Sequence, residues 1–599
     1  MRVFFLLIVF ATCLLAQSAQ ISGVVRDSTQ AVVPRAVITV TAEDTGLRRA
    51  VVSSDEGIYT VPLLPPAKYK IEVTAQGFQT SRQTGVSLET GQSARIDIVL
   101  QPGSLEQSIT VNAASSLVRT DQSGVSTVIN REFIDTLPLN GRSFQSLIAL
   151  TPGVVMTKAT FGEQGQFSVN GQRANANYFT IDGVSANIGV SAGLTLVQSA
   201  SGSLPGLGAT GGTNTLVSVE ALEEFRVQTS GYAAEYGRMP GGQITILTRS
   251  GTNKLHGSLF NFFRNDKLDA TDWFANAQKL PKPELRQNDF GGVLGGPIRR
   301  DQTFFFVSYE GLRLRQPQVL STDVPNLDAR GIFACRACRP FLNAFPIPNS
   351  KTARLGLSPF VASFTNPSSL DAGSVRIDHR IGMKVTLFGR FNEAPSSNTA
   401  RTQTLSNPVD TSVGTRTLTL GGTALLSPRV VMDTRLNWSA TSGSSYARLD
   451  NFGGAVPFDA SLFFPQGVDV ANAFGGYFLN GGIHSSFYLG KNVANSQAQW
   501  NLAHTVSYAR GAHQLKFGAD WRHVATENNP RAYDLFAYFI GSFGASIGQT
   551  VQTTVGAQED ITVFPEQCVI VRAGHVESYA EIDAEHRAAL GVESRSEWV

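Results

Sequence analysis

The sequence predicts a secreted, mainly β protein with an N-terminal antiparallel β-sandwich, an α+β domain and a partial antiparallel transmembrane β-barrel. Three observations predict this fold class. Charged residues make up only 16% of the 599 residues, while 42% are hydrophobic; the usual charged share is about 25%. Short alternating segments separated by turn residues recur along the chain. Beyond the N-terminus no run of about 18 apolar residues offers a transmembrane helix, so a membrane-spanning part would have to be a barrel.

Residues 1–19 have the pattern of a secretory signal peptide. Arg2 precedes the apolar run 3–11, and small residues at 16–19 provide a cleavage region. The alternative, a membrane anchor, needs about 20 apolar residues, whereas Thr12 interrupts this run. The pattern therefore favours export over anchoring.

Residues 20–101 are predicted to form the β-sandwich, from alternating segments at 21–26, 36–41, 58–61, 69–74 and 94–100. The chain then presents, in order, DEGIY (55–59), LLPP (63–66), YKIEV (69–73) and GF (77–78). These phrases resemble the carboxypeptidase-regulatory-like domain, which has a carbohydrate-binding-like fold. The resemblance implies a non-catalytic module, and no HExxH zinc-protease signature occurs. Glycan or partner binding and a spacer role both stay open.

The segment 104–112 follows Pro102-Gly103 and is a short β-prone run between two domains. It resembles a TonB box, formed by Leu105, Glu106, Gln107, Ser108, Ile109, Thr110 and Val111. The resemblance implies a segment that adds as a strand to the sheet edge of a periplasmic partner, mainly through backbone hydrogen bonds. An ordinary linker strand is the alternative.

Residues 113–250 mix helix and strand signals. Asn130 is placed to cap a helix that begins at Arg131, and a second helix is predicted over 144–150. Five phrases follow: FSVNGQR (167–173), YFTIDGV (178–184), VEALEEFRV (219–227), AEYGR (234–238) and GGQITI (241–246). Together they resemble the plug domain of TonB-dependent outer-membrane receptors.

From residue 255 the chain changes to longer alternating strands. SGTN (250–253) and HGSLF (256–260) resemble the first barrel strand of the Oar-like branch of these receptors. Alternation over 384–391, 430–438 and 514–522 puts mainly apolar residues on one face. A soluble sandwich alternates in the same way. The expected pattern of turns favours the barrel, because short turns near 299–302, 379–383, 427–429 and 510–512 should alternate with connections of about 20 to 60 residues.

Residues 255–599 offer about ten or eleven strands, whereas the resembled receptors close with about 22. The final segment 593–599 does not resemble an aromatic-terminated closing strand. We therefore expect the N-terminal portion of an Oar-like barrel, about half of a 22-stranded one. Such a truncated copy is not expected to transport.

The resemblance implies active uptake of a large substrate, such as a siderophore, an oligosaccharide or a peptide, with an outer-membrane location in a Gram-negative bacterium and a periplasmic N-terminal domain. Implied partners are TonB with its inner-membrane energising complex, outer-membrane lipid, the barrel assembly machinery and an unknown extracellular ligand. A surface adhesion or matrix-interaction protein without transport is the alternative from another class. A fragment degraded in the periplasm is a third.

No catalytic, cofactor or metal site is expected, and the chain is not expected to be an enzyme. The eight histidines are scattered and no GxxxxGK[ST] motif occurs. A net charge of +2 without long runs of one sign gives no nucleic-acid footprint. Cys335 and Cys338 have CxxC spacing, which favours a loop disulfide or two idle thiols over a metal site.

Three plug residues are candidate ligand contacts, namely Arg173, Tyr178 and Asp182, because they lie in the centre of the best-matched phrases. The alternative for Arg173 and Asp182 is an ion pair within the plug or between plug and barrel, since barrel lumens are lined by polar and charged groups.

Overall fold

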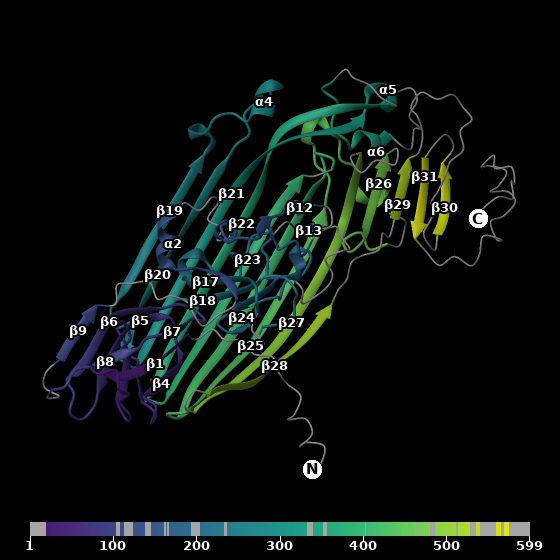
Figure 1. Ribbon diagram of the computed structural model, residues 1–599. Helices are drawn as coiled ribbons and strands as arrows, with labels where there is room; N and C mark the ends of the chain where they lie inside the picture. Colours follow the sequence, from purple (N-terminus) through teal and green to yellow (C-terminus); the bar gives the residue numbers. More distant parts are fainter. Residues whose placement is uncertain are drawn as a thin grey trace, which may run out of the picture.

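Figure 1 shows the computed structural model as a curved sheet of long strands with two smaller units at one end and on one side. The structure describes residues 19–103, 108–112, 124–137, 145–157, 159–160, 163–164, 167–192, 204–232, 236–331, 339–350, 356–401, 403–464, 468–479, 485–510, 513–527, 535–539, 559–564 and 568–573. Only the backbone is described for 108–112, 159–160, 163–164, 535–539, 559–564 and 568–573. The predicted signal peptide lies outside these ranges except for Ala19.

The N-terminal unit is a sandwich of two sheets. One has the order β4-β1-β7 with β8 also on β1, and the other has the order β3-β2-β5-β6-β9. The strands are β1 (Ala19–Asp27), β2 (Val37–Ala42), β3 (Arg48–Val52), β4 (Ile58–Leu64), β5 (Ala67–Thr74), β6 (Thr80–Leu88), β7 (Ser93–Arg95), β8 (Ile98–Leu100) and β9 (Ser108–Asn112). Alternate residues of these strands bury a shared core that includes Ile38 and Tyr69.

The sandwich is not purely antiparallel, so this part of the prediction is wrong. Strand β1 runs parallel to both β7 and β8. The chain crosses from β6 to the opposite sheet before β7, and it therefore arrives beside β1 in the same direction. The two strands β3 and β6 were not expected, because their polar residues weaken the alternation signal.

The second unit, the plug, carries a five-stranded sheet of order β10-β17-β18-β15-β16. The predicted cap is confirmed, since the Asn130 side chain accepts a hydrogen bond from Phe133 N at 3.2 Å. The second predicted helix is present but shorter than 144–150. The elements are β10 (Val125–Ile129), α2 (Arg131–Thr136), α3 (Gln145–Ile148), β11 (Val154–Met156), β12 (Ala159–Thr160), β13 (Glu163–Gln164), β14 (Phe167–Val169), β15 (Tyr178–Ile181), β16 (Val184–Ser185), β17 (Leu222–Ser230) and β18 (Gln243–Thr248).

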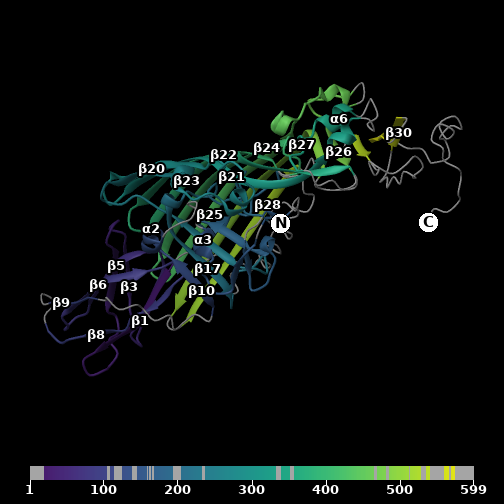
Figure 2. The same cartoon turned by 90° about the horizontal axis from the view of Figure 1, so that it is seen from above.

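The third unit is a sheet of thirteen strands within the described ranges, two or three more than expected. Seen from above, the plug elements lie on the inner side of its curve (Figure 2). Its strands are β19 (His256–Asn265), β20 (Arg286–Arg299), β21 (Thr303–Pro325), β22 (Leu357–Ile381), β23 (Val385–Arg401), β24 (Pro408–Ser427), β25 (Val430–Ala447), β26 (Phe474–Leu479), β27 (Ser486–Arg510), β28 (His513–Glu527), β29 (Leu535–Phe539), β30 (Glu559–Phe564) and β31 (Cys568–Ala573).

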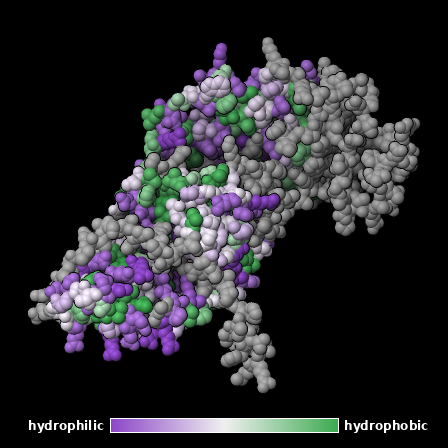
Figure 3. All heavy atoms as spheres, viewed as in Figure 1, coloured by the Kyte–Doolittle hydropathy of each residue, from purple (hydrophilic) through white to green (hydrophobic). Residues whose placement is uncertain are grey.

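The long strands have one apolar outer face and one polar inner face, as the alternation predicted. On β23 the outer residue Leu387 is 40% exposed, whereas the inner residue Arg390 is 3% exposed. In the space-filling view, many hydrophilic residues lie on the surface at the sandwich end of the molecule (Figure 3). Among the helices of the described ranges, none is long and apolar enough to cross a membrane.

The predicted short turns are confirmed, but one expected long connection is not. Strand β20 passes into β21, β22 into β23, and β24 into β25 within three residues each. The connection from β23 to β24 is only 402–407, so the expectation of connections of about 20 residues or more throughout is wrong here. The reason is strand length: β23 has 17 residues and β24 has 20, whereas crossing the bilayer takes about 9–11. These strands continue pairing well beyond the membrane.

Candidate functional site

The centre of the site is a tight turn of the plug at Asp182. Ile181 pairs with Val184, so Asp182 and Gly183 form a two-residue hairpin loop with φ values of +49° and +88°. An Asp-Gly pair suits this turn because both residues tolerate positive φ. Strand β15 also pairs in parallel with β18, which brings Thr248 to the turn. Thr248 donates to the Asp182 carboxylate from its backbone N at 3.0 Å and from its Oγ1 at 2.8 Å.

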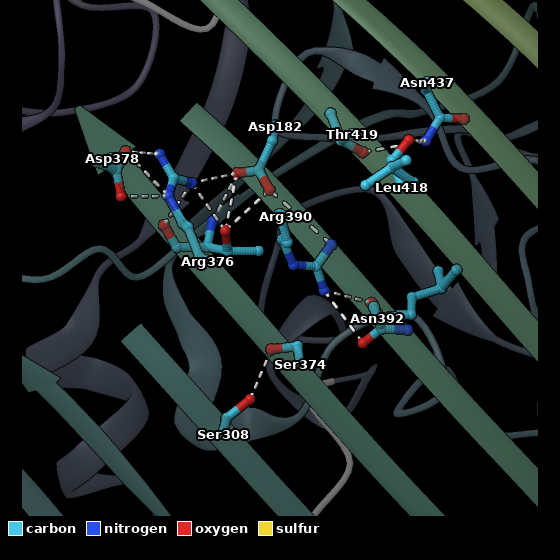
Figure 4. A network of polar contacts seen from close by, with 12 residues as sticks. Asp182, Ser308, Ser374, Arg376, Asp378, Arg390, Asn392, Leu418, Thr419 and Asn437 are labelled. Carbon is cyan, nitrogen blue, oxygen red and sulfur yellow. Dashed lines mark hydrogen bonds and ion pairs between the residues drawn. The ribbon is translucent and has the colours of Figure 1, made fainter. Parts of the chain in front are cut away.

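Two arginines of the barrel wall face the Asp182 carboxylate (Figure 4). Arg376 Nη1, on β22, lies 3.2 Å from Asp182 Oδ1, and Arg390 Nη1, on β23, lies 3.9 Å from Oδ2. Arg376 also pairs with Asp378 at 2.9 Å. The Asp182 side chain is fully buried. The two arginines and two aspartates balance in charge, which a buried cluster requires.

The same wall holds the plug backbone next to this cluster. Arg390 Nη2 donates to Leu216 O at 3.1 Å, and Asn392 Nδ2 donates to Thr215 O at 3.2 Å. Both donors are on the inner face of β23, and both acceptors belong to the plug segment before β17. The wall therefore binds plug carbonyl groups as well as the plug carboxylate.

A row of side-chain amides on β27 forms a second attachment. Asn495 Nδ2 donates to Ser191 O at 2.8 Å and Gln499 Nε2 donates to Ser185 O at 3.2 Å. Asn501 Oδ1 accepts from Ser185 N at 2.8 Å. The amides alternate along the strand, so they share its inner face, and all are buried. They pair with plug backbone much as a neighbouring strand would.

A third contact joins the sandwich to the plug. Thr90 donates to Glu224 Oε1 from its backbone N at 2.5 Å and also from its hydroxyl. Glu224 is only 5% exposed. Burial raises the pKa of the Glu224 carboxyl, the Thr90 hydrogen bonds lower it, and the neighbouring carboxylates of Glu223 and Glu89 raise it; together these causes bring the pKa to about 7.

This contact is expected to strengthen as the pH falls. A carboxyl whose pKa is raised in the docked state binds its proton more tightly there, so docking gains stability below that pKa and loses it as the pH rises through about 7. Between about pH 8 and pH 6 we expect a gain of about 1 kcal/mol. Spin-label distances between sandwich and plug, measured across this range, report the docked fraction. Glu224→Gln should abolish the pH dependence, and an unchanged slope would contradict the assignment.

The structure separates the three candidate ligand residues. Arg173 is exposed, just before the short helix at Ala174–Ala176, whereas Tyr178, the first residue of β15, and Asp182, which directly follows β15, are buried. Asp182 pairs with barrel arginines and not with Arg173. Its role in ligand contact stays a prediction. Of the predicted TonB box, 108–111 lie in β9 while 105–107 fall outside the described residues, as do Cys335 and Cys338.

Two sets of site residues were missed from the sequence. The amide row had a usable signal, since Asn495, Gln497, Gln499 and Asn501 recur with period two. Arg376 and Arg390 carried no comparable signal, because many strands bear inward charges. No cluster of three metal-ligating side chains occurs in the parts of the chain that are described.

Comparison with known proteins gives three family matches. The family model "Outer membrane beta barrel domain" matches residues 247–564, "TonB-dependent Receptor Plug Domain" matches 118–243 and "Carboxypeptidase regulatory-like domain" matches 20–101. The TonB-dependent transporter Oar of Myxococcus xanthus is 27% identical over 341 residues, which cover 54% of this chain and 29% of that relative.

Solved structures are similar at low identity. The outer membrane transporter YddB from Escherichia coli has 14% identity and a TM-score of 0.46, and the match covers 69% of this chain and 50% of that one. The ferric enterobactin receptor PfeA from Pseudomonas aeruginosa has 14% identity and a TM-score of 0.43, with coverage of 68% and 50%. The matched part of this chain thus spans at most half the length of these proteins.

Proposed function

Because this chain belongs to the outer-membrane β-barrel family of TonB-dependent receptors, we propose that it takes part in TonB-driven uptake of a large substrate across the bacterial outer membrane. The observation that carries the proposal is the polar attachment of the plug to the inner face of the barrel wall. Asp182, the carbonyl groups of Thr215 and Leu216, and Ser185 are all held by inner-face side chains.

Such an attachment suits a plug that has to move. A hydrogen bond within a protein is worth only about 0.5–1.5 kcal/mol net, because water replaces the lost partner when the bond opens. An apolar plug surface would instead expose hydrophobic area on every movement. The amide row of β27 and the arginines of β22 and β23 can therefore release the plug into water and bind it again.

The proposed orientation places the sandwich and the segment 104–112 in the periplasm, where TonB and its energising complex act. The short turns of the barrel lie at this end, since the Asp44 carbonyl of the sandwich accepts a hydrogen bond from Asn253 N at 3.0 Å and Asn253 bonds Asp301 of the β20–β21 turn at 2.7 Å. Substrate binds at the opposite end, on the long connections. Of the candidate plug residues, Arg173 is exposed and is the first choice for a ligand contact.

The test uses the strand character of the predicted box. Ile109→Pro removes a backbone donor and should abolish binding of the purified periplasmic domain of TonB, whereas Ile109→Ala keeps the backbone and should change affinity by less than about threefold. Where cells that make the receptor take up a member of a panel of labelled siderophores, oligosaccharides and peptides, deletion of 105–111 should in addition stop that uptake. Uptake that survives the deletion would reject the proposal. Ligand binding at the cell surface without uptake would favour the adhesion protein.

A further inference from the structure

Strand β9 is an added strand on the sandwich sheet. It lies at the end of the order β3-β2-β5-β6-β9 and pairs in parallel with β6, with Thr80 opposite Ser108 and Thr84 opposite Asn112. Figures 1 and 2 both show β9 beside β6 at the outer limit of the sandwich. The family model of this sandwich ends at residue 101, so the domain's own sequence leaves the β6 edge open for a strand from outside it.

The edge of β6 that β9 occupies carries polar side chains, which suit a strand edge that is exposed to water. Its paired residues Thr80–Thr84 read Thr-Ser-Arg-Gln-Thr, and polar or charged side chains are how proteins protect exposed edges. Arg82 is held by Glu72 on β5 at 3.1 Å. The described core of the sandwich lies wholly between Ala19 and Leu100. An edge of this composition can meet water when β9 leaves.

The chain before β9 is fixed to the start of β6. Gln79 N donates to Gln101 O at 2.8 Å, and Gly103 N donates to Gly77 O at 3.2 Å. Residues 108–112 thus begin close to the edge that they occupy, which lowers the entropic cost of pairing. A parallel pairing of five residues is also weaker per residue than an antiparallel one, so it can be exchanged.

We propose that the β6 edge is a strand-binding surface that holds residues 108–112 in the resting receptor, and that the periplasmic partner receives this segment only by exchange from β6. This inference rests on the proposed function for the identity of the partner.

The way in which a pulling force would pass through the chain supports exchange. While β9 stays on β6, tension on it acts on the sandwich, which contacts the plug at Glu224 and the barrel rim at Asn253. After release, tension reaches β10, the first plug strand.

The experiment locks the two strands together in the full chain in outer-membrane vesicles. Ser81 and Ile109 are direct register partners, and neighbouring strands lie about 4.8 Å apart, within the reach of a disulfide. Ser81→Cys with Ile109→Cys should therefore cross-link, as mapped by peptide mass spectrometry. Ser81→Cys with Val111→Cys is the matched control, because two residues of offset place these positions beyond about 7 Å.

Binding of the purified periplasmic domain of TonB is then measured before and after reduction. We expect the oxidised in-register variant to bind at least tenfold more weakly than its reduced form, and the reduced form to match the unmodified chain, which also shows that the variant is folded. Equal cross-linking of the two pairs would overturn the strand-binding surface. Undiminished binding by the oxidised variant would overturn exchange, because the partner would then be adding to the outer edge of β9. If even the unmodified chain fails to bind while the in-register cross-link forms, the proposed function and exchange are rejected together and the surface on β6 is upheld.

Discussion

Replacing Asp182 with alanine is expected to destabilise the docked plug by about 3 kcal/mol, because it leaves a buried arginine without a carboxylate. Arg376 keeps Asp378 at 2.9 Å, but Arg390 has its nearest described carboxylate at Asp182 and is only 3% exposed. Alanine also loses the acceptor for Thr248 and fits the positive φ of this turn less well than aspartate. The loss of docking free energy is measured from the protease accessibility of the plug in purified receptor, followed across a denaturant series.

Two further variants separate charge from shape. Asp182→Asn keeps the turn and an acceptor for Thr248 but removes the charge, so it isolates the cost of the unpaired Arg390. Adding Arg390→Met to Asp182→Asn should recover part of that cost, and the double-mutant cycle gives the coupling energy. Asp135, an exposed partner of Arg131 on α2, is the control carboxylate, where Asp→Asn should cost less than about 1 kcal/mol. A cost at Asp182 no larger than at Asp135 would contradict the proposed plug–barrel junction.

Local signals explain which elements the sequence could predict. The cap at Asn130 and the alternation over 514–522 each depend on residues within a few positions of one another. Such features are decided by backbone chemistry before any long-range contact forms. They were sufficient for the mainly β class, whereas the three-part architecture was predicted mainly from the phrases that resemble known domains.

Features that depend on distant partners could not be predicted. Arg376 meets Asp182 across 194 positions, and nothing local distinguishes it from other inward charges. The connection at 402–407 was misjudged because the sequence pattern does not show how far above the membrane two strands continue to pair. The docking of β9 on β6 could not be predicted either. Strand pairing uses backbone hydrogen bonds, which depend little on the side chains that the sequence specifies.

The outer face of β24 shows where the lipid belt lies. Arg416 is on this face and pairs with Glu393 at 2.7 Å, with its side chain 63% exposed; it marks the polar boundary at one end. Leu418, Leu420 and Leu426 follow on the same face, and the strand ends at Ser427 beside the short turn. The stretch 416–426 is close to the length of about 9–11 residues that crosses a bilayer. Leu420 therefore lies near the bilayer midplane, and Leu426 lies at the membrane boundary beside the short turn.

Leu420→Arg is accordingly expected to cost about 2–4 kcal/mol of barrel stability, whereas Leu426→Arg should cost less than about 1 kcal/mol. The two positions share strand, face and substitution, and both side chains are well exposed, at 47% and 57%. They differ in depth, so a charge is desolvated by lipid at the first and reaches the headgroups at the second. Urea titration of the receptor in lipid vesicles, read by heat-modifiable migration, measures both costs, with Leu420→Ala as the control for lost side-chain volume. Equal costs at the two positions would mean that this face does not meet the hydrocarbon core.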